Sequence, residues 1–208
     1  MNNFFDYIQN KFQRMLPPEQ PLQQPAVDKF AAEKKQIADA EIELKGDGKV
    51  YHGVDAVVAA AKKWNHPHIS PIAYNIIMEE GFVDGVYKDT GTYKEPTWGV
   101  GQTKDWMGKN FFTEVLPAYE EKARKNTKDY AKLPVEAQSA VVSMAYRGDW
   151  GPKTKKFLKE GKWEQAAQEY LRHSNYKAGL KKNASSAEKA IAERMRRNAE
   201  AIRDIGRA

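Results

Sequence analysis

Cysteine is absent from this 208-residue chain, which excludes disulfide bonds and thiolate metal sites. Long apolar runs are missing as well, since the longest, residues 56–61, is far shorter than the roughly 20 residues that span a bilayer. The N-terminus lacks the basic start and the apolar core of a signal peptide. We therefore expect no transmembrane segment, and a protein made in a cytoplasm without its own secretion signal.

Histidine is scarce, with four residues scattered along the chain. His66 and His68 are close in sequence, but no acidic or histidine partner stands near them at the spacing of metal ligands. We therefore expect no metal site and no cofactor.

The formal net charge is +6, which fits either an ordinary basic protein or one attracted to a polyanion. Nucleic acid, an anionic membrane and a cell wall carrying carboxylates and phosphates are the candidate polyanions. Lysine and arginine are mixed with acidic residues along the predicted helices, and no nucleic-acid-binding module is present. We therefore expect no nucleic-acid partner.

The first 69 residues differ in character from the rest. Residues 3–16 form an amphipathic helical pattern that either docks on protein or lies on a membrane surface. The prolines that follow give a semi-rigid linker, so residues 1–26 form one segment. Residues 27–69 are a helical extension with a predicted helix at 54–64, and residues 70–208 form the third segment.

A helix followed by a β-hairpin opens the third segment. Ser70 is a candidate N-cap, Pro71 suits the first helical turn, and Gly81 ends the helix. The glycine- and aromatic-rich stretch 81–101 predicts the hairpin. The fold class is therefore α+β and mostly helical, with further helices expected at about 110–125, 134–147, 152–159, 163–172 and 185–204.

Three polar residues of this region match the needs of glycosidic bond cleavage. That reaction requires a protonated acid and a second carboxylate that directs water or stabilises positive charge. Glu80 stands at a helix C-terminus among apolar residues, where dipole and desolvation favour the protonated form. Asp89 lies near the hairpin turn, and Thr97 is expected across the hairpin from it. The spacing alone is weak evidence, because it fits better with Glu80 as a helix-end charge and Asp89 as a turn former.

The order of these residues resembles the active-site signature of phage-type lysozymes, glycoside hydrolase family 24. That signature is Glu, eight residues, Asp, about five residues, Thr, then Gly-x-Gly, which Glu80, Asp89, Thr97, Gly99 and Gly101 reproduce in order. Three further pieces resemble the family's central helix end, its later helix-turn-helix and its last helix: residues 143–148, 157–167 and 196–200. The resemblance covers about residues 70–204.

The resemblance implies a two-lobed fold, with a small hairpin lobe and a larger helical lobe. It implies a muramidase that cleaves the β-1,4 bond between N-acetylmuramic acid and N-acetylglucosamine of peptidoglycan. Glu80 is then the general acid, while Asp89 and Thr97 position the attacking water. Such attack inverts the anomeric centre, so we expect the two carboxyl groups to be roughly 6.5–9.5 Å apart.

The resemblance also implies substrate-binding positions. Gly99 and Gly101 leave room for the polymer, and Tyr146 belongs to the same expected set. Arg147 either contacts substrate or faces solvent. Arg197 is either a charge partner of Glu80 or a surface arginine.

Two departures from the family pattern concern Thr97 and its surroundings. Seven residues separate Asp89 from Thr97, two more than usual, and Gln102 stands where the family often has histidine. These departures keep open the alternative of a non-catalytic virion structural protein on a lysozyme scaffold. A lyase that forms an anhydro product without water is also chemically possible, although the pair of Asp89 and Thr97 favours attack by water.

Residues 1–69 lie outside the resemblance and predict a tether. A lysozyme with such an extension is expected in phage lysis, as an endolysin, or in envelope penetration, as a virion component. A secreted antibacterial effector is the remaining alternative. The expected partners are peptidoglycan and, through residues 1–69, a virion or delivery-machine protein.

Overall fold

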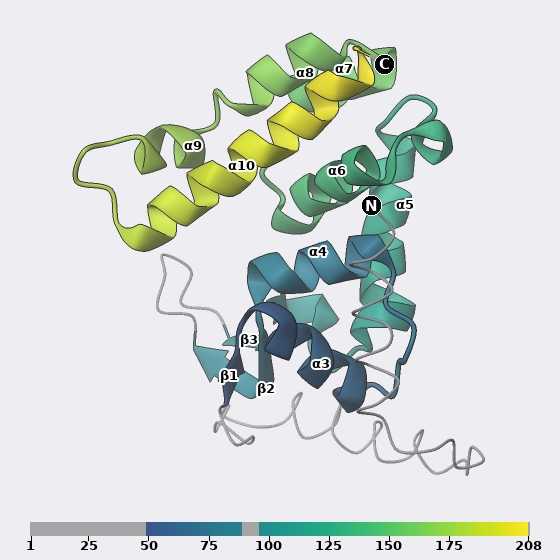
Figure 1. Cartoon of the computed structure of the whole chain (residues 1–208), viewed down its shortest axis with the longest axis vertical. Helices are drawn as coiled ribbons and strands as arrows, with labels where there is room; N and C mark the ends of the chain where they lie inside the picture. The colour runs from purple at the N-terminus through teal and green to yellow at the C-terminus, as the bar shows by residue number, and fades with distance from the viewer. Residues whose placement is uncertain (1–48, 89–95, 208) are drawn as a thin grey trace. The chain divides into compact units, whose positions relative to one another are not determined.

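The computed structural model describes residues 49–88 and 96–207 (Figure 1). The expected helix at 3–16, the proline-rich linker and Asp89 lie outside the described residues. The chain divides into two compact units, Met1–Val115 and Leu116–Ala208. Each unit is described by itself below.

The N-terminal unit contains a four-stranded antiparallel sheet with the strand order β1-β2-β3-β4. Strands β2 and β3 confirm the hairpin expected over 81–101. Strands β1 and β4 were not predicted, because strands of two residues carry no periodic pattern. The bounds are β1 Val50–Tyr51, β2 Phe82–Lys88, β3 Pro96–Gly99 and β4 Gln102–Thr103.

Two helices pack with this sheet. Helix α3, Gly53–Lys63, contacts β1, β2 and helix α4, Pro71–Glu80 (Figure 1). The predicted helix at 54–64 is therefore confirmed, and it packs on the first elements of the segment that begins at residue 70. A short 3-10 helix, Lys104–Trp106, and a π-helical turn, Phe111–Val115, follow the sheet.

An aromatic cluster forms the core of the N-terminal unit. The Trp64 ring lies 5.5 Å from Phe82 and 5.5 Å from Trp98, centroid to centroid, in both cases edge to face. Phe112 and Phe111 follow at 5.8 and 6.2 Å. Such pairs contribute about 0.5–1.5 kcal/mol each beyond the area that they bury. The cluster therefore fixes the end of α3 against the hairpin and the π-helical turn.

The C-terminal unit is helical. Helix α6 is its most buried element, with eight buried residues, and the left-handed Gly148 (φ 66°) ends it. Helix α10 packs against α6, α8 and α9 (Figure 1). The α-helices have the bounds α5 Leu116–Lys125, α6 Val135–Arg147, α7 Pro152–Glu160, α8 Trp163–Tyr170, α9 Ser174–Gly179 and α10 Ser186–Ile205, and a 3-10 turn spans Tyr130–Lys132.

The helices expected in this unit are confirmed, and α9 is an addition. Helix α9 has six residues, too few to show an apolar period, and it ends at Gly179. A methyl group at Gly179 would lie 2.3 Å from the Glu188 carbonyl oxygen and 2.5 Å from the Ala192 side chain, both on α10. Glycine therefore permits the close approach of α9 to α10. The coarse prediction of a mostly helical α+β chain with a small antiparallel sheet is confirmed.

A buried ion pair crosses the interior of the C-terminal unit. Arg194 on α10 donates from Nη2 to Asp149 Oδ2 at 2.6 Å, and the two side chains are 6% and 4% exposed. The Tyr170 hydroxyl donates to the other carboxylate oxygen of Asp149 at 3.0 Å. Burial raises the pKa of Asp149, while the nearby Arg194 and the Tyr170 hydrogen bond oppose that shift. Arg194 is thus buried, whereas Arg196 and Arg197 on the same helix are exposed.

Candidate active site

Glu80 is the last residue of α4, and local sequence fixes where that helix begins and ends. The Ser70 hydroxyl accepts a hydrogen bond from the Ala73 amide at 3.1 Å, as expected of an N-cap. At the other end, Gly81 has a φ of 75°, and a methyl group there would lie 2.9 Å from the Tyr51 carbonyl oxygen. Glycine is thus required at the residue that follows Glu80. The Glu80 side chain is half-buried where α4 gives way to β2.

The turn between β3 and β4 approaches the Glu80 carboxylate. A methyl group at Gly101 would lie 3.4 Å from Glu80 Oε2, and Gly101 has a φ of 73°. The backbone therefore reaches the carboxylate with no side chain in between. Gly101, one of the expected substrate-binding positions, therefore lies against Glu80.

Thr97 lies in β3, with β2 on one side and β4 on the other. Its cross-strand partners are Tyr87 and Thr103, and its side chain is 5% exposed. The register thus pairs Thr97 with Tyr87, two residues before Asp89, and Lys88 with Pro96. Asp89, expected opposite Thr97, follows Lys88 directly and lies outside the described residues. The expected separation of the Glu80 and Asp89 carboxyl groups stays a prediction.

Gln102, at the position where histidine was expected from the family pattern, has a structural role that sequence reasoning missed. It is 2% exposed, and its Nε2 donates to the carbonyl oxygens of Trp106 at 2.9 Å and Lys109 at 3.0 Å. These two bonds tie the chain after β4 to the sheet. A methyl group at Gly99 would lie 2.7 Å from Gln102 Oε1 and 3.2 Å from the Trp64 ring. The absence of a side chain at Gly99 therefore allows Gln102 and Trp64 to pack closely against its backbone.

Three predicted residues belong to the C-terminal unit. Tyr146 is half-buried near the end of α6, with its ring 4.8 Å from that of Tyr119. Arg147, the last residue of α6, is exposed. Arg197 is exposed on α10, and its Nη1 lies 3.9 Å from Glu193 Oε1. The pairing of Arg197 with Glu80 stays a prediction.

The histidine pair considered as a metal site is placed by aromatic packing. The His66 ring stacks on Phe112, with centroids 4.3 Å apart and an interplanar angle of 11°. Burial lowers the pKa of His66, and the neighbouring His68 lowers it further. Across residues 49–88 and 96–207, no three His, Asp or Glu side chains gather closely enough to hold a metal ion. Within the same ranges, no helix has the length and apolar character needed to cross a membrane.

Comparison with known proteins found no match for this chain among family models, curated proteins or solved structures.

Proposed function

We propose that this chain is a peptidoglycan hydrolase, a muramidase that cleaves the β-1,4 bond between N-acetylmuramic acid and N-acetylglucosamine. The observation that carries the proposal is the setting of Glu80. It ends a capped helix directly before a hairpin, and the Gly101 backbone returns to its carboxylate without a side chain. In this proposal, the turn without a side chain leaves room beside the carboxylate for a bulky polymer. The ordered resemblance to phage-type lysozymes over residues 70–204 supports the same assignment.

In the proposed reaction Glu80 donates its proton to the glycosidic oxygen as the bond to the muramic acid C1 breaks. Asp89 accepts a proton from a water molecule whose oxygen bonds to C1 from the opposite face. The products are a reducing N-acetylmuramic acid end of inverted configuration and a free 4-hydroxyl on N-acetylglucosamine. Thr97 orients the water, and its place in the middle of three paired strands gives its backbone a fixed position.

The proposal places this chemistry in phage lysis or in penetration of the bacterial envelope. Within residues 1–69, β1, α3 and Trp64 pack into the unit that holds Glu80, so the proposed attachment to a virion or delivery-machine protein falls to the residues before 50. The fold expected from the resemblance, two lobes with the polysaccharide between them, belongs to the same proposal.

Clearing of purified peptidoglycan by three proteins tests the assignment. Wild type is expected to clear the suspension, and Glu80→Gln to lose about 10²–10⁴-fold in rate because the acid is removed. Glu79→Gln, one residue earlier on α4 and also half-buried, is the matched control and should retain activity. All three should share nearly the same Tm. Full activity of Glu80→Gln would overturn the assignment, and an inactive wild type would favour the non-catalytic scaffold.

A further inference from the structure

The positive charge of this chain is concentrated in one of its two units. The C-terminal unit, Leu116–Ala208, holds 21 lysine and arginine residues against 12 aspartate and glutamate residues, a net charge of +9. The N-terminal unit, Met1–Val115, holds 13 against 16, a net charge of −3. A polyanion is therefore attracted to the C-terminal unit, whereas Glu80 belongs to the acidic one.

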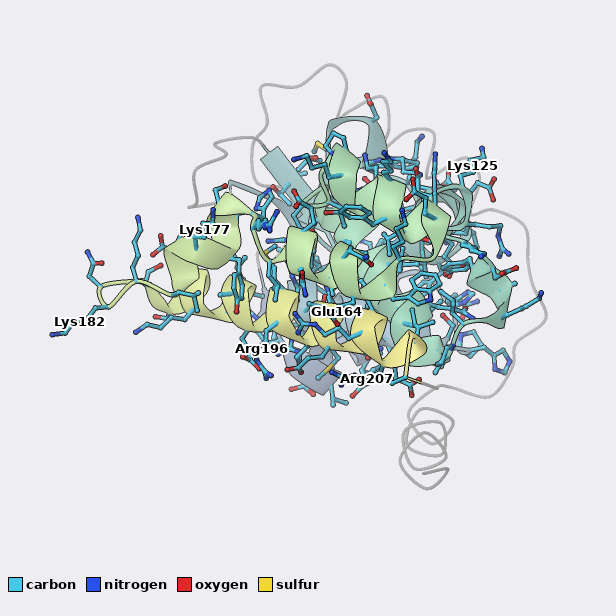
Figure 2. The ribbon with its side chains drawn as sticks, turned by 90° about the horizontal axis from the view of Figure 1, so that it is seen from above. Lys125, Glu164, Lys177, Lys182, Arg196 and Arg207 are labelled. Atoms are coloured by element: carbon cyan, nitrogen blue, oxygen red, sulfur yellow. The ribbon has the colours of Figure 1, made fainter. Side chains whose placement is uncertain are left out.

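Within the C-terminal unit, cations gather around the connection between α9 and α10. Residues 172–190 contain five lysine and arginine residues and one acidic residue, Glu188. The Glu188 carboxylate accepts hydrogen bonds from the backbone amide of Ser185 at 2.7 Å and from its hydroxyl at 2.8 Å; these bonds, and to a lesser degree the charge of Lys181, lower the pKa of Glu188. Figure 2 shows Lys177 and Lys182 toward one end of this unit and Lys125 at the other. We call residues 177–182, which comprise the end of α9 and the turn that follows it, the lysine loop.

An exposed leucine stands in the middle of this basic segment. Leu180 is 65% exposed, the highest value among the large apolar side chains of the described residues. The preceding Gly179 packs its backbone on α10, so the position of the loop is set by that close contact. A single exposed leucine is ordinary on a protein surface. Leu180 differs from other exposed apolar residues in that lysines flank it in sequence, at positions 177, 181 and 182.

We propose that the lysine loop is a contact surface for an anionic lipid membrane. The ammonium groups of Lys177, Lys181 and Lys182 pair with lipid phosphates, and Leu180 inserts its side chain at the level of the headgroups. A soluble polyanion such as nucleic acid or polyphosphate needs the lysines alone. The membrane interface is the anionic partner that also supplies an apolar phase for the leucine, and for this reason we favour it.

Co-sedimentation of the full chain with vesicles tests the proposal. The vesicles are phosphatidylglycerol mixed equally with phosphatidylcholine, or phosphatidylcholine alone. Wild type should bind the anionic vesicles, less so as salt rises. Because each lysine near an anionic surface contributes a factor of about five, the triple change of Lys177, Lys181 and Lys182 to glutamine should weaken binding on the order of 100-fold. Leu180→Ser should weaken it about tenfold, through lost apolar burial.

Two matched controls come from the same unit. Val135, 38% exposed at the start of α6, is changed to serine, and Lys125, at the other end of the unit, is changed to glutamine. Neither variant should change the affinity for vesicles by more than about fivefold, which is the contribution of a single lysine near an anionic surface. Each variant is also tested on inorganic polyphosphate, where Leu180→Ser should behave as wild type.

The outcomes separate the candidate partners. Selective loss of vesicle binding in Leu180→Ser supports the proposal. Equal binding of Leu180→Ser and Val135→Ser overturns it, as does vesicle binding by the triple lysine variant at the wild-type level. Tighter binding to polyphosphate than to vesicles, with no effect of Leu180→Ser, would assign the loop to a soluble polyanion. These results do not depend on Glu80, so they stand whether or not the chain cleaves peptidoglycan.

Discussion

The buried pair of Asp149 and Arg194 predicts an asymmetric response to loss of either charge. Removing one partner of a buried ion pair typically costs about 3–5 kcal/mol, because the other charge is left buried and uncompensated. Asp149→Asn leaves a guanidinium that cannot lose its proton, so we expect the upper end of that range. Arg194→Met leaves the Asp149 carboxyl buried without its partner. Burial already raises the pKa of this carboxyl, so it can take up a proton, which relieves part of the cost of burying the charge. We therefore expect about 3 kcal/mol for this variant, the lower end of the range.

Urea denaturation followed by tryptophan fluorescence and circular dichroism measures both effects. The double variant, Asp149→Asn with Arg194→Met, should be more stable than Asp149→Asn alone, because no buried charge remains. Arg196→Met, an exposed residue of the same helix, is the control and should leave the free energy of unfolding nearly unchanged. A larger loss for Arg194→Met than for Asp149→Asn would refute this reasoning, and so would additive single effects.

The same pair predicts the sign of a pH dependence. Burial raises the pKa of Asp149 in the folded state. At pH values between the ordinary pKa of aspartate and this raised pKa, the folded state therefore binds a proton at Asp149 more readily than the unfolded state does. In that window the contribution of Asp149 to stability falls as pH rises, and above it the contribution is constant. The difference in unfolding free energy between wild type and Asp149→Asn should therefore shrink with rising pH across the window. A difference that grows there would contradict the shift.

Three glycine and cap variants have expected effects on the free energy of unfolding, measured in urea. Gly99→Ala should cost about 2–3 kcal/mol, because φ is 60° and the new methyl group meets Gln102 Oε1. Gly179→Ala should cost about 2 kcal/mol or more, because its methyl group meets the backbone of α10. Ser185→Ala should cost about 1 kcal/mol by removing the capping box of α10. Gly151→Ala, with nothing within 4 Å of the new methyl group, should cost about 0.5 kcal/mol; a cost equal to that of Gly99→Ala would show that contacts do not set these effects.

Helix boundaries could be predicted from the sequence wherever a capping residue stands at the end of the helix. Ser70 and Gly81 bound α4 as expected, and the hairpin after it follows from the glycine- and aromatic-rich stretch. Strands β1 and β4 were missed because two residues carry no periodic pattern of their own. They are defined by pairing, β1 with the distant β2 and β4 with the adjacent β3.

Side-chain roles that depend on distant partners were not predictable. Asp149 and Arg194 are 45 residues apart, and nothing near either residue in sequence identifies the other as its partner. Gln102 was missed for a different reason: it was interpreted only as a missing histidine, although its amide donates to the nearby carbonyl groups of Trp106 and Lys109, four and seven residues further along the chain. At the candidate site the structure places the Gly101 backbone beside the Glu80 carboxylate, whereas the catalytic arrangement of Glu80, Asp89 and Thr97 stays a prediction.

Hydrolysis by this chain can be measured by mass spectrometry of muropeptides released from purified peptidoglycan in ¹⁸O-labelled water. We expect fragments that end in reducing N-acetylmuramic acid with one ¹⁸O at the new end. Glu80→Gln should release almost none, and Glu79→Gln should match wild type. The absence of released fragments from wild type, or fragments that end in anhydro-muramic acid without the label, would contradict hydrolysis assisted by Glu80.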